Sequence, residues 1–349
     1  MNCDTGEQPN SCIRATYTAT LALPKIGHYF YPGKSYCGLT KVIDIGIPAK
    51  ALEGLNLSVN LTTPWQVRDL IPDREPTAHK GDAGKLFIVA GSVGMTGAAT
   101  LAAQAAVKSG CGLVTVGCPK SLNDILEIKL TEAMTRPLPE VRSTRCLALR
   151  GLGDILQGIH NADAACLGPG VGRHHDTKEL FKRLIASLDR PAVLDADGLF
   201  PFSGQPELLK ACKADLVLTP HVGEFSRLSG LSIEQINQDR IKAASDFAIA
   251  TGKVILLKGA PTIIASPDGS SYINPTGNPG MATGGSGDVL SGLIGALLAL
   301  RMGAYEAAIC GAFIHGWAGD LAQRVVGTFG MSASDISNQI PKALKVLKS

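Results

Sequence analysis

The sequence predicts an α/β fold with a mostly parallel central sheet covered by helices on both faces. From residue 84 onward, short continuous apolar runs alternate with amphipathic or alanine-rich stretches of helix length. Glycine, aspartate, histidine or lysine follows most of these runs. Strands buried on both faces have this apolar character, and ligands of such sheets bind beyond the carboxyl ends of the strands.

The predicted elements alternate along the chain. The strands are residues 85–90, 113–116, 164–167, 192–195, 215–218 and 254–257. Their short, uninterrupted apolar character is typical of a parallel sheet. The helices are residues 96–109, 177–188, 233–251 and a last one that begins near Asp288. The first of these helices is rich in alanine and closes at Gly110.

Residues 1–56 have a different character. Residues 15–23 and 41–48 are predicted strands, and no periodic segment of helix length accompanies them. Strands without partners or covering helices leave edges open and one face unburied, so we expect this segment to be poorly packed or mobile. Prolines, which are typical of turns and linkers, follow this segment in the sequence. The predicted organisation is therefore residues 1–56, a linker and domain entry at 57–80 and a main domain at 81–349.

Composition narrows the class of protein. The hydrophobic content of 45% and charged content of 18% are ordinary for a globular chain. A net charge of +3 without a basic cluster gives little support for nucleic-acid binding. The nine cysteines form no Cys-x-x-Cys pair and suggest core residues of a reducing compartment rather than a metal cluster. No secretory signal begins the sequence, and residues 289–300 are too short to span a bilayer. We expect a cytoplasmic protein.

The strongest functional signal is the loop at residues 278–287 with the carboxylate that follows it. Gly284, Gly285 and Gly287 let backbone N–H groups converge on an anion, and the next helix directs its positive end there. A nucleotide phosphate fits such a loop. Asp288 is either an N-cap, worth ~1 kcal/mol, or a base for a hydroxyl proton, and one residue can do both. At a helix start its pKa is expected to be lowered.

Other strand-end residues leave two interpretations open. Lys258 is a solvated strand end or a phosphate-facing cation, and residues 168–172 are a tight turn or a ligand loop. His221 and Glu224 form a plain surface turn or contact a ligand or a metal-bound water. Asp195 is structural at its strand end. The pair at residues 174–175 lacks metal spacing and is predicted to be solvated or capping.

Together these segments resemble a known family. Residues from about 60 to 349 are similar to the NAD(P)H-hydrate dehydratases of the ribokinase-like superfamily. Seven ordered segments carry the resemblance: 79–85, 90–99, 168–172, 195–199, 219–225, 257–260 and 284–288. Residues 1–56 resemble the C-terminal tail of an NAD(P)H-hydrate epimerase domain, through residues 4–6, 16–25 and 42–48. Epimerase activity is not expected, because that domain's nucleotide-binding loops and catalytic aspartate segment are missing.

The resemblance implies a hydro-lyase of nicotinamide nucleotide repair, which converts (6S)-NAD(P)H hydrate back to NAD(P)H with ADP or ATP. It implies phosphorylation of the C6 hydroxyl and elimination of phosphate, with Asp288 as the catalytic residue. Mg²⁺ is the implied cofactor, with Glu224 as a ligand through water, and a homo-oligomer is expected. The implied substrate-binding residues are Ala98, Gly170, Gly172, His221 and Asp288. The implied nucleotide-binding residues are Lys258, Gly259, Ala260, Pro261, Thr262, Asn278, Pro279, Gly280, Met281, Ala282, Thr283, Gly284, Gly285, Ser286 and Gly287.

Two alternatives remain at this point. A small-alcohol kinase of the same superfamily, for a vitamin precursor for example, would share Asp288 and the anion loop but release a phosphorylated product. A nucleotide-binding or structural remnant would bind without turnover.

Overall fold

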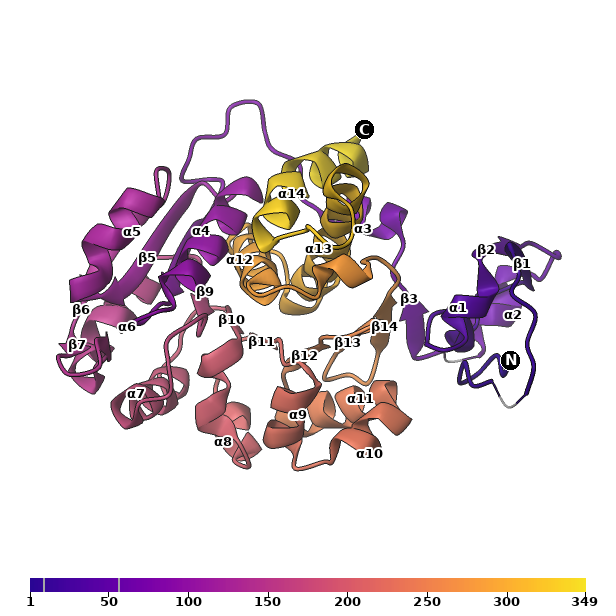
Figure 1. Cartoon of the computed structure of the whole chain (residues 1–349), viewed down its shortest axis with the longest axis horizontal. Helices are drawn as coiled ribbons and strands as arrows, with labels where there is room; N and C mark the ends of the chain where they lie inside the picture. Colours follow the sequence, from indigo (N-terminus) through magenta and orange to yellow (C-terminus); the bar gives the residue numbers. More distant parts are fainter. Residues whose placement is uncertain (9, 56) are drawn as a thin grey trace.

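The short apolar strands assemble into one ten-stranded sheet, seen in a computed structural model that describes residues 1–8, 10–55 and 57–349 (Figure 1). All pairings are parallel except those of β12 with β13 and of β13 with β14. The predicted α/β fold with a mostly parallel sheet is therefore confirmed. In spatial order the strands are β3 (Val59–Leu61), β14 (Ser271–Asn274), β13 (Thr262–Ala265), β12 (Val254–Leu257), β11 (Leu216–Leu218), β10 (Ala192–Leu194), β9 (Ala164–Leu167), β4 (Lys85–Val89), β5 (Leu113–Pro119) and β6 (Met134–Leu138).

Helices cover both faces of the sheet (Figure 1). Alternate residues of a strand point to opposite faces, so Ile88 packs in one core layer while Phe87 and Val89 pack in the other. The first layer lies under α3 (Pro64–Leu70), α4 (Thr96–Lys108), α5 (Asn123–Lys129), α12 (Ser286–Ala299), α13 (Ala304–Val326) and α14 (Ala333–Lys348). The second lies under α6 (Leu152–His160), α7 (His175–Ala186), α8 (Pro206–Lys210), α9 (Val222–Ser229), α10 (Ile233–Gln238) and α11 (Arg240–Thr251).

The single helix predicted at residues 233–251 is wrong, because the chain forms α10 and α11 there. Asp239 breaks the helix with φ −150° and ψ 85°, and its carboxylate accepts a hydrogen bond from the Lys242 N–H at 2.9 Å. Asp239 therefore caps the second helix instead of continuing the first. The antiparallel hairpin of β13 and β14 and the small sheet of β7 (Glu140–Val141) and β8 (Cys146–Leu147) lie outside the predicted elements.

Residues 57–80, predicted as a linker and domain entry, contribute two elements to the main fold. β3 pairs in parallel with β14 at the edge of the large sheet. Thr63 caps α3 by accepting from the Gln66 N–H at 3.3 Å, and Pro64 occupies the first turn, where a missing N–H costs nothing. The main sheet thus begins before residue 81.

The N-terminal segment forms a separate small unit. β1 (Tyr17–Leu21) and β2 (Leu39–Ile43) pair in parallel as a two-stranded sheet beside α1 (Lys34–Cys37) and α2 (Ala49–Glu53). Large apolar side chains of this unit, such as Ile13 and Leu39, are exposed, whereas His28 and Cys37 are buried. The unit is thus only partly packed, and its expected mobility stays a prediction. Within the described parts of the chain, no helix is both long and apolar enough to cross a bilayer.

Candidate active site

The predicted strand-end segments meet at the carboxyl edge of the large sheet. Asp195 follows β10, His221 lies just beyond β11, and Lys258 follows β12. An isolated parallel bridge joins His221 to Lys258, so the two segments lie side by side. Two cavities open at this edge, on either side of the first turn of α12.

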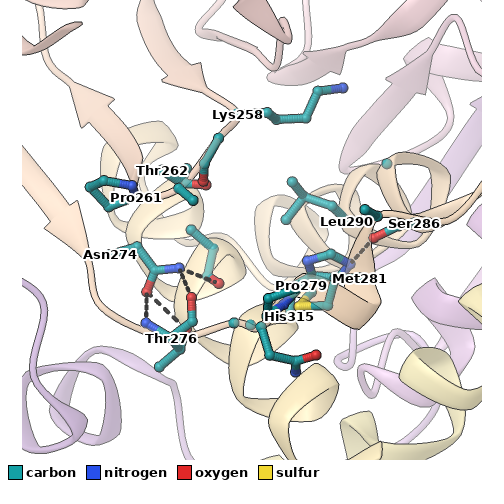
Figure 2. A pocket seen from close by; sticks show the side chains of 18 of the residues that line it. Lys258, Pro261, Thr262, Asn274, Thr276, Pro279, Met281, Ser286, Leu290 and His315 are labelled. Atoms are coloured by element: carbon teal, nitrogen blue, oxygen red, sulfur yellow. Dashed lines mark hydrogen bonds between the residues drawn. The ribbon is translucent and has the colours of Figure 1, made fainter. Parts of the chain in front are cut away.

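The larger cavity has a volume of about 680 Å³ and is shown in Figure 2. The loop after β12, the loop before α12 and the first turn of α12 form its wall. Gly280 is buried in the short helix at Pro279–Met281, and Gly284 and Gly285 line the second cavity. Twelve of the predicted nucleotide-binding residues line the larger cavity: Lys258, Gly259, Ala260, Pro261, Thr262, Asn278, Pro279, Met281, Ala282, Thr283, Ser286 and Gly287.

The second cavity, of about 430 Å³, contains most of the predicted substrate-binding residues. Ala98, Gly170 and Asp288 line it together with Glu224. His221 instead lines the larger cavity. Gly172 donates its N–H to Asp197 Oδ2 at 3.1 Å, and Asp197 is part of the wall of the second cavity. The structure thus brings Ala98, Gly170 and Asp288 together and separates His221 from them.

The N-terminus of α12 separates the two cavities. Its N-cap is Gly285, at φ 91°, so the expectation that Asp288 is the N-cap is wrong. This positive φ favours glycine, because residues with a Cβ rarely adopt it. Asp288 lies in the first turn, where its carboxylate faces the second cavity, while Ser286 and Gly287 line the larger one.

The expected lowering of the Asp288 pKa is also wrong. Burial, followed by the nearby Asp195 carboxylate, raises the pKa of Asp288 to about 7, and Lys258 only partly opposes this rise. A favourable helix dipole does not compensate for the lost hydration and the like charge. Asp288 is therefore a carboxylate that both holds and releases a proton near neutral pH, as a general base requires.

A buried ion pair lies behind Asp288. Lys258 Nζ is 2.8 Å from Asp195 Oδ1, and Ser291 Oγ donates to Asp195 Oδ2 at 2.7 Å. Burial opposes the charge on both partners, yet Lys258 keeps the pKa of Asp195 below its usual value and Asp195 keeps that of Lys258 above its own. Asp195 was expected to be structural at the end of its strand, and a buried ion pair between two strand ends agrees with this expectation. In the sequence, Asp195 stands in the Asp-Ala-Asp segment at the end of β10.

His221 and Glu224 form a reciprocal cap at the start of α9. His221 Nδ1 accepts from the N–H groups of Gly223 at 3.0 Å and Glu224 at 3.3 Å, and Glu224 Oε2 accepts from the His221 N–H at 2.9 Å. Burial lowers the pKa of His221, although the Glu224 carboxylate, whose Oε1 lies 3.5 Å from His221 Nε2, partly opposes this effect. Because Nδ1 accepts both of these hydrogen bonds, the ring proton lies on Nε2. Glu224 also lies 3.9 Å from Lys258 Nζ.

Other residues of the larger cavity were outside the sequence predictions. Asn274 and Thr276 line one side of it and hydrogen-bond to carbonyls of α13 at 3.1 Å and 3.0 Å (Figure 2). Neither residue belongs to a functional sequence motif, so no pattern in the sequence predicted them. His315 lies 3.5 Å from Ser286 Oγ, and burial lowers its pKa to about 4. His174 caps α7 by accepting from the Asp176 N–H at 3.2 Å, in agreement with its predicted role.

The mostly parallel sheet, the glycine loop at a helix N-terminus and the carboxylate in its first turn define an enzyme of the ribokinase-like superfamily. The family model of the NAD(P)H-hydrate dehydratases matches residues 86–342. The chain therefore belongs to the NAD(P)H-hydrate dehydratase family, as the sequence resemblance predicted.

Known proteins agree with this assignment. The bifunctional NAD(P)H-hydrate repair enzyme of Moorella thermoacetica is 44% identical over 348 residues, which are 100% of this chain and 66% of that protein. The enzyme of the same name from Thermofilum pendens is 40% identical over 345 residues, 99% of this chain and 65% of that one. The chain thus spans just under two thirds of the length of these relatives.

A solved structure is also similar. The ADP/ATP-dependent NAD(P)H-hydrate dehydratase of Bacillus subtilis, co-crystallised with ATP and Mg²⁺, is 28% identical with a TM-score of 0.71. The match covers 84% of this chain and 99% of the Bacillus protein.

Proposed function

We propose that the chain catalyses the ADP- or ATP-dependent dehydration of (6S)-NAD(P)H hydrate to NAD(P)H. One observation carries this proposal: the first turn of α12 presents Ser286 and Gly287 to one cavity and Asp288 to the other. A nucleotide phosphate on one side and a substrate hydroxyl on the other can meet across this turn.

The larger cavity suits the nucleotide. The first N–H groups of a helix have no partner within it and attract phosphate oxygens, and Gly287 carries no Cβ that would keep a phosphate away. Lys258 Nζ also lies at this end, where it is paired with Asp195 at 2.8 Å. Among the described lining residues two are lysines and none is a carboxylate. The described wall therefore presents N–H donors to a polyanion and no lining carboxylate that would repel it.

The second cavity suits the hydrated dinucleotide. Asp288 removes the proton of the C6 hydroxyl while the hydroxyl oxygen attacks the terminal phosphorus of the nucleotide. The bond from that phosphorus to the bridging oxygen breaks, and the shortened nucleotide leaves. The C6–O bond then breaks with loss of phosphate and of a proton from C5, which restores the ring double bond. The N–H groups at the start of α12 stabilise the charge on the transferred phosphoryl group.

The residues present also fit Mg²⁺ held mainly by the nucleotide. Asp195 is occupied by Lys258 and Ser291, whereas Glu224 lines the neighbouring second cavity, with Oε2 accepting from the main-chain N–H of His221 and Oε1 3.5 Å from His221 Nε2. Mg²⁺ retains several waters and takes few protein oxygens in nucleotide sites, so Glu224 would hold it through water. The ion would neutralise part of the negative charge of the phosphates.

The test is a repair assay on the full chain with hydrated NADH or NADPH, using ADP and ATP separately. Recovery of the reduced-nicotinamide absorbance with either nucleotide supports the proposal. If neither nucleotide restores absorbance while a small alcohol is phosphorylated, the dehydratase proposal is wrong and the small-alcohol kinase is right. The cytoplasmic location, the homo-oligomer, the domain boundaries and the lack of epimerase activity stay predictions.

A further inference from the structure

Two side chains of the N-terminal unit lie in the wall of the larger cavity. Tyr31 and Lys34 line it, although the rest of the wall comes from residues 221–316. Lys34 Nζ donates to the Pro275 carbonyl at 3.5 Å, which brings α1 against the end of β14. Residues 1–56 therefore contribute to this cavity.

These two residues lie away from the phosphate end. Figure 2 shows Asn274 and Thr276 on one side of the cavity and Ser286 with Leu290 on the other. Pro275, the contact of Lys34, stands between Asn274 and Thr276. With the phosphates at the start of α12, the other end of the nucleotide reaches the side of Tyr31 and Lys34.

The charge of Lys34 is incompletely matched. Within the described ranges it forms no ion pair of 4.0 Å or less. Burial lowers the pKa of Lys34, and the Asp320 carboxylate partly opposes this effect. The Asp320 oxygens already accept from the Gly277 N–H at 3.1 Å and from Asn278 Nδ2 at 3.0 Å. Lys34 thus has N–H donors left for a ligand.

Tyr31 offers an aromatic surface beside this cation. Its side chain is 51% exposed, and Lys34 Nζ lies 5.9 Å from the centre of its ring. An exposed ring at the wall of a cavity can pack against a flat base without displacing other side chains.

We infer that Tyr31 and Lys34 form the nucleoside end of the nucleotide site. The Tyr31 ring packs against the base, and the Lys34 ammonium donates to the ribose oxygens. The inference rests on the proposed function, because it takes ADP or ATP as the ligand. It makes the N-terminal unit part of nucleotide binding.

Calorimetric titration of the full chain with ADP and with inorganic tripolyphosphate tests this inference. Lys34→Met and Tyr31→Ala should each weaken ADP binding by about tenfold, because each loses one ligand contact. Tyr31→Phe keeps the ring and should retain binding, and tripolyphosphate affinity should not change. Lys41→Met, on the exposed surface of β2, is the matched control and should behave as wild type.

Unchanged ADP affinity in both variants would overturn the inference. An equal loss of tripolyphosphate affinity would overturn the nucleoside assignment, because the residues would then act at the phosphate end. If the wild-type chain binds neither ADP nor ATP, the proposed function and the inference both fail. If it binds ADP and both variants bind ADP equally well, only the inference fails. If the thermal melt shows that Lys34→Met does not fold, the comparison of ADP affinity between Tyr31→Ala and Tyr31→Phe decides the question.

Discussion

Lys258 and Asp195 form an ion pair of 2.8 Å in which the Asp195 side chain is only 1% exposed. The pair joins the ends of β12 and β10, and Asp195 also raises the pKa of the neighbouring Asp288. One buried carboxylate thus fixes the lysine of the larger cavity and adds to the effect of burial on the pKa of the proposed base.

Lys258→Met should destabilise the protein by about 3 kcal/mol, because Asp195 would remain buried without its partner. Urea unfolding at neutral pH measures this loss. Lys242→Met is the matched control, since Lys242 forms an exposed ion pair of 2.7 Å with Asp246 and its loss should change stability little. Equal effects of the two substitutions would show that burial does not govern the Lys258 pair.

Asp288→Asn should stabilise the protein at pH 8, by roughly 1–3 kcal/mol. The folded pKa of about 7 lies above the unfolded value of 3.8, so the folded state binds the proton more tightly. Stability of the wild type therefore falls as the pH rises from about 4 to about 7, and Asn removes this loss.

The stabilising effect should vanish below pH 4, where the carboxyl is protonated in both states. Thermal or urea unfolding over this pH range provides the measurement. Asp124→Asn, at an exposed position of α5, is the matched control for the removal of a carboxylate. A gain for Asp288→Asn that is equally large at pH 3 would contradict the raised pKa.

The rate of the repair reaction should fall as the pH falls through about 7, because the proposed base must be ionised to accept the hydroxyl proton. A pH profile of kcat, measured with saturating nucleotide, should lose about tenfold per pH unit on the acidic side. A rate that stays flat down to pH 5 would show that no group with the pKa of Asp288 controls the chemistry.

Gly259→Ala should weaken nucleotide binding and reduce stability by about 1–3 kcal/mol. Gly259 has φ 157°, and a Cβ there would collide with the guanidinium of Arg240, which donates to the Lys258 carbonyl at 3.0 Å. Gly204→Ala is the control for backbone conformation alone, because Gly204 has φ 66° with open space around its Cβ position. If the two variants lose equal stability and nucleotide affinity, the packing on Arg240 is unimportant.

The strands and their functional ends could be predicted because buried parallel strands are apolar and their loops are not. The break at Asp239 could not, since an aspartate within a periodic stretch is compatible with one helix or with two. Nor could the pKa of Asp288, because its rise depends on burial and on Asp195, which is distant in the sequence.

Long-range contacts account for the rest. Ser291 donates to a carboxylate 96 residues away, and Lys34 contacts a carbonyl 241 residues away. Neither residue belongs to a motif that would predict such a partner. The contribution of Tyr31 and Lys34 to the larger cavity therefore emerges only from the folded arrangement.

The most direct test of Asp288 as the base between the two cavities compares wild type with Asp288→Asn. Both are incubated with hydrated NADH and ADP or ATP while absorbance recovery is followed, and nucleotide affinity is measured in parallel. We predict that the variant loses at least about a hundredfold in turnover while it still binds the nucleotide. Turnover that survives the substitution would contradict this account and leave Asp288 with a structural role in the first turn of α12.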